Sequence, residues 1–365
     1  MKDLFGGIYK NKTVLITGHT GFKGSWLGLW LQSLGAEVVG YSLDPPTNPN
    51  HFDLLKMDIK SIIADMRDFN SLLNVFELYN PEIVFHMAAQ PIVRLSYTNP
   101  RETLEMNIMG TVNVFEACRL NPKVKAIINI TSDKCYDNKE WVWGYRENDA
   151  MGGYDPYSAS KGCSELLTNA YRNSFFHPDS YGKKHSVLLA SARAGNVIGG
   201  GDWAQDRLIP DLIRSVIEKK TMCIRSPGAT RPWQHVLDPL SGYLHLGQKL
   251  LMEKKDFVGA WNFGPVNNKE YTVVEVVDYF KKYWNAIDYK VDQNSINPHE
   301  ARLLKLDCSK ALTDLNWKSI WNSNEVFDKT INWYKEFYTN DSILTIQDLN
   351  DFITSAKDKK VEWAV

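Results

Sequence analysis

The chain has 365 residues, of which 44% are hydrophobic and 12% aromatic, which is enough for a substantial core in one large domain or two lobes. Lysine and arginine number 42 against 43 aspartates and glutamates, so no nucleic-acid partner is expected. The amino end lacks an apolar signal region, and no apolar run reaches the roughly 18 residues of a membrane span, which predicts a cytoplasmic protein without a membrane partner. Five cysteines show no metal spacing, so no metal site is expected.

Short apolar runs alternate with helical patterns through the first half of the chain. We expect strands at 13–17, 37–43, 61–66, 82–89 and 125–131, with helices at 23–34, 68–79 and 100–120. Strands that alternate with helices of this length form right-handed βαβ units. The pattern therefore predicts an α/β fold with a Rossmann-like, doubly wound parallel sheet.

The regular alternation stops at residues 137–156, a stretch rich in Gly, Trp and charge that could form a loop over a site. It resumes with a helix at 157–176 and a strand at 186–199, and further helices are expected at 208–219, 238–253 and 272–284. We predict a nucleotide-binding domain in 1–185 whose sheet is completed by 186–199. A smaller mixed α/β substrate lobe should occupy 200–340 with an interleaved boundary, and 341–365 should be peripheral.

Three glycines follow the first expected strand in "TGHTGFKGSW" and open the first helix. Gly18 suits the chain reversal, Gly21 allows the backbone to approach a pyrophosphate, and Gly24 allows close packing of helix on strand. The amino end of the helix then offers N–H groups and a positive dipole end to phosphates. This placement predicts a dinucleotide site.

The choice of dinucleotide depends on the end of the second expected strand, where an acidic residue binds the ribose hydroxyls in NAD-binding folds. Ser42 takes the expected place and Asp44 lies two residues further on. Lys23 could contact a phosphate, but no arginine follows the strand to hold a 2′-phosphate. The pattern favours NAD as the cofactor.

The apolar run "KAIINI" ends on Ser132, Asp133 and Lys134 in "TSDKCYDN". Ligands of open parallel sheets bind at the carboxyl ends of the strands, so these side chains lie where chemistry is expected. A solvated charge pair in a turn is the alternative for an isolated Asp-Lys. The rest of the chain decides between the two interpretations.

Tyr157 and Lys161 lie four residues apart in "YDPYSASKG", on one face of the helix expected there. A lysine ammonium beside a phenol favours the phenolate and should lower the tyrosine pKa from about 10. Such a phenolate is a general base for a hydroxyl group.

Together these motifs resemble the extended short-chain dehydrogenase/reductase superfamily, over roughly residues 10 to 335. "IADMRD" and "HMAAQ" match its cofactor-lining segments, and Asn107 matches a structural asparagine. The resemblance implies NAD as cofactor and a cofactor-binding set of Gly18, His19, Gly21, Phe22, Lys23, Gly24, Asp44, Asp65, Met66, Ala88, Ala89, Tyr157 and Lys161. It also implies a homodimer or dimer of dimers, paired through the helices near 100–120 and 157–176.

The pair Asp133-Lys134, with "RAGNVIGGGDWAQDRLIPD" and "TRPWQHVLDP", looks like the CDP-glucose branch of the sugar-nucleotide 4,6-dehydratases. That branch implies a hydro-lyase acting on CDP-glucose, a substrate for deoxysugar formation. Its catalytic set would be Ser132, Asp133, Lys134, Tyr157 and Lys161. Its substrate-binding residues would be Asn196, Arg231 and Arg302.

By this resemblance Asp133 is the acid for the departing C6 hydroxyl, and Lys134 is the base for the C5 proton. Lys134 could instead stay charged and stabilise an enolate, or only tune Asp133. The alternatives at the level of the whole chain are a dTDP- or GDP-sugar dehydratase, a sugar-nucleotide 4-epimerase, or an NAD-sensing protein without turnover.

Overall fold

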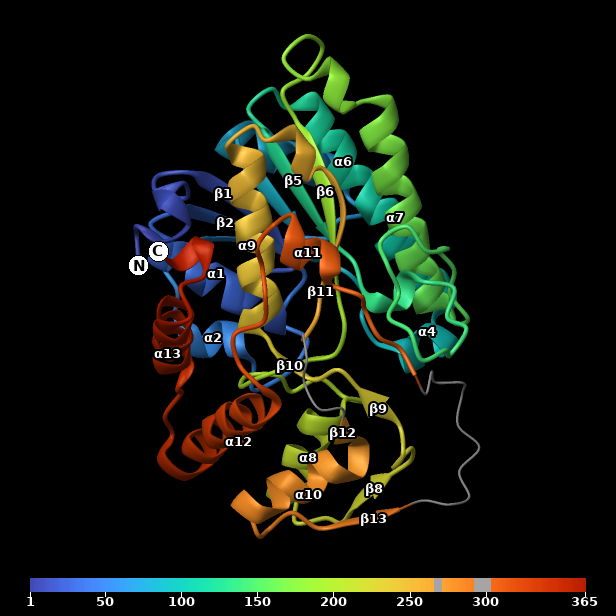
Figure 1. Ribbon diagram of the computed structural model, residues 1–365, viewed down its shortest axis with the longest axis vertical. Helices are drawn as coiled ribbons and strands as arrows, with labels where there is room; N and C mark the ends of the chain where they lie inside the picture. Colours follow the sequence, from blue (N-terminus) through green and yellow to red (C-terminus); the bar gives the residue numbers. More distant parts are fainter. Residues whose placement is uncertain (266–270, 292–302) are drawn as a thin grey trace.

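A parallel sheet of seven strands forms the centre of the computed structural model, which describes residues 1–265, 271–291 and 303–365 (Figure 1). The strands lie in the order β3-β2-β1-β4-β5-β6-β11, so the order reverses between β1 and β4. Their bounds are β1 Thr13–Thr17, β2 Glu37–Ser42, β3 Lys60–Ile63, β4 Ile83–His86, β5 Ala126–Ile130, β6 Leu188–Ala194 and β11 Gly259–Phe263. This arrangement confirms the predicted doubly wound fold.

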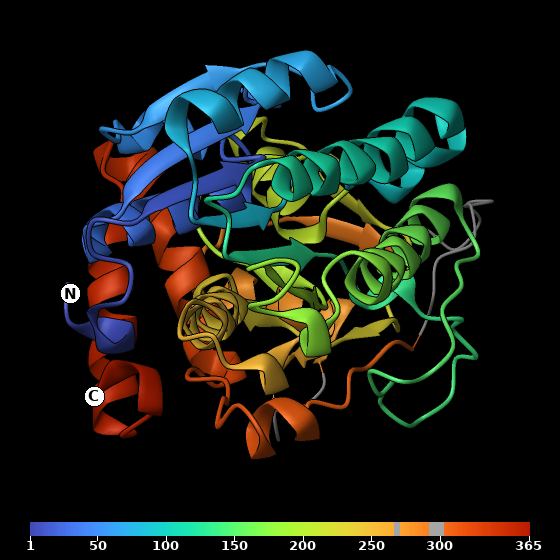
Figure 2. The same cartoon turned by 90° about the horizontal axis from the view of Figure 1, so that it is seen from above.

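Helices cover both faces of the sheet (Figures 1 and 2). Val14 and Ile16 of β1 join one apolar cluster, whereas Leu15 joins the other, as expected for a strand that is buried on both faces. On the first side lie α1 Phe22–Leu34 and α9 Leu237–Leu251, and on the second lie α3 Phe69–Tyr79, α6 Gly110–Leu120 and α7 Pro156–Ser174.

Several predicted elements differ in length from those observed. The helix expected at 100–120 consists of α5 (Pro100–Leu104), a π-helical turn (Glu105–Met109) and α6. The strand expected at 186–199 divides into β6 and the short β7 (Val197–Ile198). Two short helices that were not predicted are α2 (His51–Leu55) and α4 (Val93–Thr98).

The prediction that 186–199 completes the sheet is wrong, because β11 pairs with β6 along its whole length. The apolar run of β11 is short and is surrounded by loop-like sequence, which hid its periodicity. Together β11 and α9 return to the first domain from the second half of the chain. The proposed limits of the two domains therefore interleave, and the boundary itself stays a prediction.

The smaller lobe lies beyond the carboxyl ends of the sheet strands (Figure 1). It contains α8 Leu208–Ile217, β8 Met222–Ile224, β9 Thr230–Arg231, β10 Gln234–His235, β12 Tyr271–Thr272, α10 Val273–Tyr283 and β13 Tyr289–Val291. After it come α11 Ser309–Thr313, α12 Ser323–Asn340 and α13 Thr345–Asp358. Short turns of 3₁₀-helix lie at Leu4–Gly7, Asp133–Cys135, Pro178–Ser180, Lys255–Phe257 and Glu362–Ala364.

The C-terminal segment 341–365 packs into the main core rather than at its edge. Leu349 and Phe352 of α13 are buried, and Trp363 stacks on Phe5 with ring centroids 5.0 Å apart. The prediction of a peripheral segment is therefore wrong in its packing. The apolar residues of α13 recur at helical spacing, and Phe352 packs against Trp30 of α1 and against Trp363.

Candidate active site

A cavity of about 1420 Å³ lies between the carboxyl edge of the sheet and the smaller lobe. Residues that follow β1, β4, β5 and β6 line it from the sheet side. Of the residues predicted for the site, those that line it are Gly18, Gly21, Phe22, Lys23, Gly24, Asp44, Met66, Ala88, Ala89, Ser132, Asp133, Lys134, Tyr157, Lys161, Asn196 and Arg231. The fold thus gathers most of the residues predicted for cofactor, catalysis and substrate around one cavity. Arg302 lies outside the described residues.

The glycine turn after β1 is shaped by close approaches of the backbone. Gly18 has a φ of +80°, and a Cβ there would lie 2.8 Å from the Cα of Ala88. A Cβ on Gly24 would lie 2.1 Å from the carbonyl oxygen of Gly18. Gly21 caps α1 without a side-chain hydrogen bond, so the first turn of this helix faces the cavity with backbone N–H groups. These features fit the pyrophosphate of a dinucleotide.

Two residues of the predicted cofactor set, His19 and Asp65, contact neighbouring elements outside the cavity lining. The His19 ring packs so closely on β2 that a Cβ on Gly40 would lie 2.2 Å from it, and its Nε2 hydrogen-bonds the Ser61 hydroxyl at 2.7 Å. Asp65 accepts a hydrogen bond from Arg67 at 2.5 Å. Neither His19 nor Asp65 lines the cavity, whereas Asp44 does.

Ser132 organises the turn that follows β5. Its hydroxyl donates to Asp133 Oδ1 at 2.9 Å and accepts from the Lys134 backbone N–H at 3.2 Å, which caps a short 3₁₀-helix. Burial raises the pKa of Asp133, although the nearby Lys134 charge and the Ser132 hydrogen bond oppose the shift. A carboxyl group with a raised pKa suits the role of a general acid.

Helix α7 brings Tyr157 and Lys161 to this turn. It begins where the Asp155 carboxylate accepts the Ser158 N–H at 2.9 Å, with Pro156 in the first turn. Tyr157 and Ser132 line the same cavity, and the Ser132 hydroxyl acts to lower the pKa of the Tyr157 phenol. The predicted catalytic residues therefore meet in space.

The protonation of Tyr157 differs from the sequence expectation. Burial raises its pKa to about 12, while the Ser132 hydrogen bond and the Arg207 charge oppose the shift. The sequence predicted that the Lys161 charge would lower the pKa of Tyr157, but burial disfavours the phenolate more strongly and raises it. Burial also lowers the pKa of Lys161 to about 8, against the negative charge of Glu165. The Lys161 ammonium donates to the Ile130 carbonyl at 3.4 Å.

The side of the cavity formed by the smaller lobe carries the predicted substrate residues. Arg231 is buried and donates to the Thr230 carbonyl at 2.8 Å, and its charge favours the ionised form of Asp133. The Asn196 backbone carbonyl accepts from Gln234 at 3.3 Å, so it follows β6 at a fixed position. Both residues therefore face the same cavity as the catalytic set.

Arg207 is a cation at the site that the sequence did not indicate. Arg207 lines the cavity and pairs with Asp202 at 2.9 Å, and its charge reaches both Tyr157 and Lys23. Arg207 lies in the quoted segment "GGGDWAQDRLIPD", but no spacing in that segment indicated which of its polar residues would face the site.

The described residues contain no group of three or more His, Cys, Asp or Glu side chains that could hold a metal ion. Within that same part of the chain, every helix is too short or too polar to cross a membrane.

Comparison with known proteins places these features in a family. A model of the family described as GDP-mannose 4,6 dehydratase matches residues 15–330. The CDP-glucose 4,6-dehydratase of Salmonella typhimurium is 50% identical over 351 residues, which cover 95% of this chain and 98% of that protein.

Solved structures share the fold at lower identity. An epimerase from Methanothermobacter thermautotrophicus superposes with a TM-score of 0.78 at 23% identity and covers 90% of this chain and 94% of its own. The dTDP-glucose 4,6-dehydratase of Bacillus anthracis, solved in complex with NAD, gives a TM-score of 0.70 at 21% identity and covers 89% and 97%.

Proposed function

Because the chain belongs to the GDP-mannose 4,6 dehydratase family, we propose that it is an NAD-dependent hydro-lyase that converts CDP-D-glucose to CDP-4-keto-6-deoxy-D-glucose. The observation that carries this proposal is 50% identity, over 95% of the chain, to a CDP-glucose 4,6-dehydratase. The convergence of Tyr157, Lys161, Ser132, Asp133 and Lys134 on one cavity supports it. The product is a precursor of deoxysugars.

The first half of the reaction needs a base at the C4 hydroxyl of the sugar. Tyr157 takes this proton, and the Ser132 hydroxyl favours the phenolate. The ammonium of Lys161, which lines the same cavity, favours the phenolate by its charge. When bound, NAD would accept the C4 hydride and return it to C6, and its cationic ring would favour the phenolate. Gly18, Gly21 and the first turn of α1 would hold its pyrophosphate.

The second half removes water across C5 and C6. The C4 ketone makes the C5 hydrogen acidic, and one group must take that proton while another protonates the departing C6 hydroxyl. Asp133 supplies the acid, because burial favours its protonated form. Lys134 lines the same cavity and serves as the base for C5, or else holds the enolate as a cation.

The diphosphate of the substrate needs cationic partners on the side of the smaller lobe. We assign Arg231 to this role, because its guanidinium lies at the cavity wall and can bind phosphate oxygens in pairs. Asn196 is assigned to the sugar. The sequence assigns Arg302 to the diphosphate as well.

The test of the proposed function is turnover on a panel of CDP-, dTDP-, UDP- and GDP-glucose, with keto-sugar formation and net NADH both measured. We expect product from CDP-glucose alone and no accumulated NADH, because the hydride returns within each turnover. Product from dTDP- or GDP-glucose instead would overturn the base assignment. Binding of NAD without any product would favour a sensor, and change of configuration at C4 an epimerase.

We also propose a homodimer or a dimer of dimers in the cytoplasm, as the sequence predicts. The helices expected at the two-fold axis carry apolar side chains that are exposed in the single chain, namely Met109, which is 51% exposed, and Leu166, which is 59% exposed. Light scattering of the purified protein should give at least twice the mass of one chain. A replacement of Leu166 by Glu should shift the mass toward that of the monomer.

A further inference from the structure

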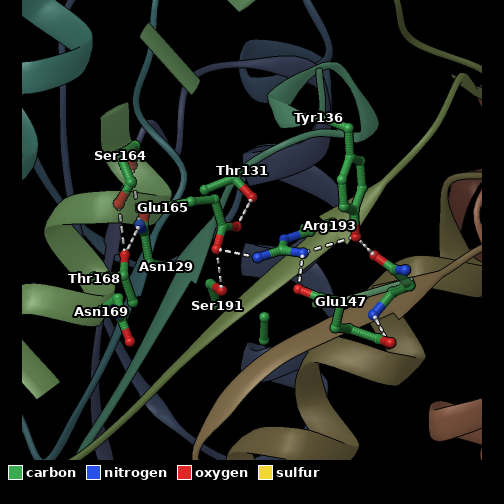
Figure 3. A network of polar contacts seen from close by, with 12 residues as sticks. Asn129, Thr131, Tyr136, Glu147, Ser164, Glu165, Thr168, Asn169, Ser191 and Arg193 are labelled. Atoms are coloured by element: carbon green, nitrogen blue, oxygen red, sulfur yellow. Dashed lines mark hydrogen bonds and ion pairs between the residues drawn. The ribbon is translucent and has the colours of Figure 1, made fainter. Parts of the chain in front are cut away.

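A buried network of polar side chains lies behind the catalytic turn, with Glu165 at its centre (Figure 3). The Glu165 carboxylate accepts hydrogen bonds from the Thr131 hydroxyl, from the Ser191 hydroxyl at 2.7 Å and from Arg193 Nη2 at 2.7 Å. Only 4% of each side chain of the Glu165–Arg193 pair is exposed. None of these residues takes part in the proton and hydride transfers of the proposed reaction.

A buried ion pair of this kind is weak evidence for a role in stability alone. The desolvation of two charges can exceed their mutual attraction, and well-packed apolar side chains often serve as well. The three hydrogen bonds to Glu165 and the pairing with Arg193 keep its pKa below the usual range despite burial. The network therefore maintains a fixed negative charge inside the protein, and its position indicates what that charge does.

The network holds the catalytic turn at both ends. Thr131, immediately before Ser132, donates to Glu165 on α7. Tyr136, immediately after Cys135, accepts a hydrogen bond from Arg193 Nη1 at 2.7 Å. The residues between these two anchors form the turn that carries the proposed acid and base, so the network fixes the turn against the helix that carries Tyr157.

The anchor at Tyr136 extends to the neighbouring strand and loop. The Tyr136 hydroxyl donates to Asn262 Oδ1 on β11 at 2.7 Å, and Asn262 in turn donates to the Tyr145 carbonyl at 2.8 Å. Arg193 also donates to the Glu147 carbonyl at 3.0 Å. The loop at 137–156 is thereby tied to the sheet by the same network.

The same carboxylate lies one helical turn from Lys161, on the same face of α7. Two titratable neighbours of Lys161, Cys135 and His86, are kept neutral by burial. Burial raises the pKa of the Cys135 thiol and lowers the pKa of His86 to about 3. Lys23 adds a second positive charge. Glu165 supplies the negative charge that opposes the loss of the Lys161 proton.

We propose that Glu165 is a positioning residue for this reaction, which fixes the Ser132–Cys135 turn against α7 and holds Lys161 in its charged form. This inference rests on the proposed function, because it assigns to Glu165 a role in that chemistry. Replacement of a residue that only stabilises the fold would leave the pH dependence of kcat unchanged, whereas replacement of Glu165 should shift it.

The test compares Glu165→Gln with Glu147→Gln, which removes the carboxylate that accepts the Asn262 N–H at 2.9 Å elsewhere in the same network. In the wild type, kcat should fall above about pH 8 as Lys161 loses its proton. In Glu165→Gln this alkaline limb should move down by about one pH unit, and kcat at pH 7 should fall about 10- to 100-fold. Glu147→Gln should leave the limb in place. The proposal would be overturned if the alkaline limb of the kcat profile stayed at its wild-type pH in Glu165→Gln, or if it shifted equally in both variants.

A second variant keeps the test decisive if Glu165→Gln does not fold. Glu165→Asp retains the charge but shortens the reach to Thr131, so kcat should fall at least about tenfold while the alkaline limb stays near that of the wild type. Unchanged kcat in this variant would overturn the positioning role.

A binding measurement separates this inference from the proposed function. NAD affinity, followed by tryptophan fluorescence from pH 6 to 10, needs no sugar nucleotide. In Glu165→Gln, the fall in affinity with rising pH should begin about one pH unit lower than in the wild type. A wild type that binds NAD but converts no CDP-glucose would contradict the proposed substrate alone. An identical pH dependence in both proteins would contradict the role of Glu165.

Discussion

Lys161 and Glu165 lie one turn apart on α7, and both are buried, yet burial has opposite consequences for them. Burial lowers the pKa of Lys161 to about 8, where its charge is readily lost. Glu165 keeps a pKa below the usual range, because an arginine and two hydroxyl groups surround its carboxylate. On this one face of α7, the turn next to the cavity carries an incompletely compensated group, whereas the following turn carries a fully paired charge.

This contrast separates chemistry from structure within a single helix. A group whose burial is not fully compensated titrates near working pH and can exchange protons with a substrate. A group that is fully paired keeps one protonation state and fixes the geometry. Substitutions next to the cavity should therefore act mainly on turnover, and substitutions at the paired charge should act on stability as well as on the geometry of the site.

The largest expected effect is at the turn of α7 next to the cavity. Tyr157→Phe removes the base for the C4 hydroxyl, so kcat with CDP-glucose should fall about 10³-fold. The melting temperature should stay the same or rise, because a buried phenol hydroxyl is removed. A variant that retains more than about a tenth of wild-type turnover would show that Tyr157 is not the base.

At the Glu165–Arg193 pair, one turn further along α7, a large effect on stability is expected. Arg193→Met leaves the Glu165 carboxylate buried without its partner, which should lower the free energy of unfolding by about 3–5 kcal/mol. The double variant with Glu165→Met should recover most of that loss, because no charge is then left unpaired. Urea unfolding of the wild type, both single variants and the double variant gives the coupling energy. Additive losses would refute the idea of a compensated pair.

Lys134 has two alternative roles, the base for the C5 proton or a cation that holds the enolate, and a single variant separates them. Lys134→Met should reduce dehydration about 10²-fold, with exchange of the C5 hydrogen into deuterated solvent reduced in parallel. Mass spectrometry of recovered substrate measures that exchange. Lost dehydration with C5 exchange intact would exclude Lys134 as the base.

The smallest effect concerns an incompletely paired carboxyl group outside the site. Asp238 on α9 accepts the Ile320 N–H at 2.6 Å, but its Oδ2 has no hydrogen-bond partner among the described residues, and burial raises its pKa to about 7. The protonated form is thus favoured in the folded state. Its stabilising contribution should be complete below about pH 4 and lost as the pH rises through 7.

Asp238→Asn should flatten this part of the stability profile by an amount on the order of a few kcal/mol between pH 4 and pH 8. Asp348, whose pKa is also raised to about 7, titrates in the same range, so the test is the difference between variant and wild type. Identical profiles in chemical unfolding would show that Asp238 is not titrating there.

The sequence indicated which residues the fold brings together at the cavity, because their signals are local. The glycines around Gly21 lie between a strand and a helix, the Ser132 turn ends an apolar run, and Tyr157 with Lys161 shares a helical spacing. Each signal spans only a few residues. The doubly wound fold followed from the alternation of strands and helices in the same way.

What the sequence could not show depends on contacts between distant segments. Glu165 meets Arg193 on a neighbouring strand, and no spacing along the chain marks that pair. Strand β11 gains its place in the sheet only through pairing with β6. The pKa of Tyr157 was expected to fall but is raised, because the depth of burial cannot be read from spacing.

The most direct test of the central claim is to follow the C4 hydrogen. CDP-glucose that carries deuterium at C4 should give a 4-keto-6-deoxy product with deuterium in its C6 methyl group, measured by NMR and mass spectrometry. Deuterium that starts at C4 and is found at C6 means that hydride moves from C4 to C6 within one active site. A product without deuterium at C6, or recovery of the label in free NADH, would contradict the internal hydride transfer on which the account depends.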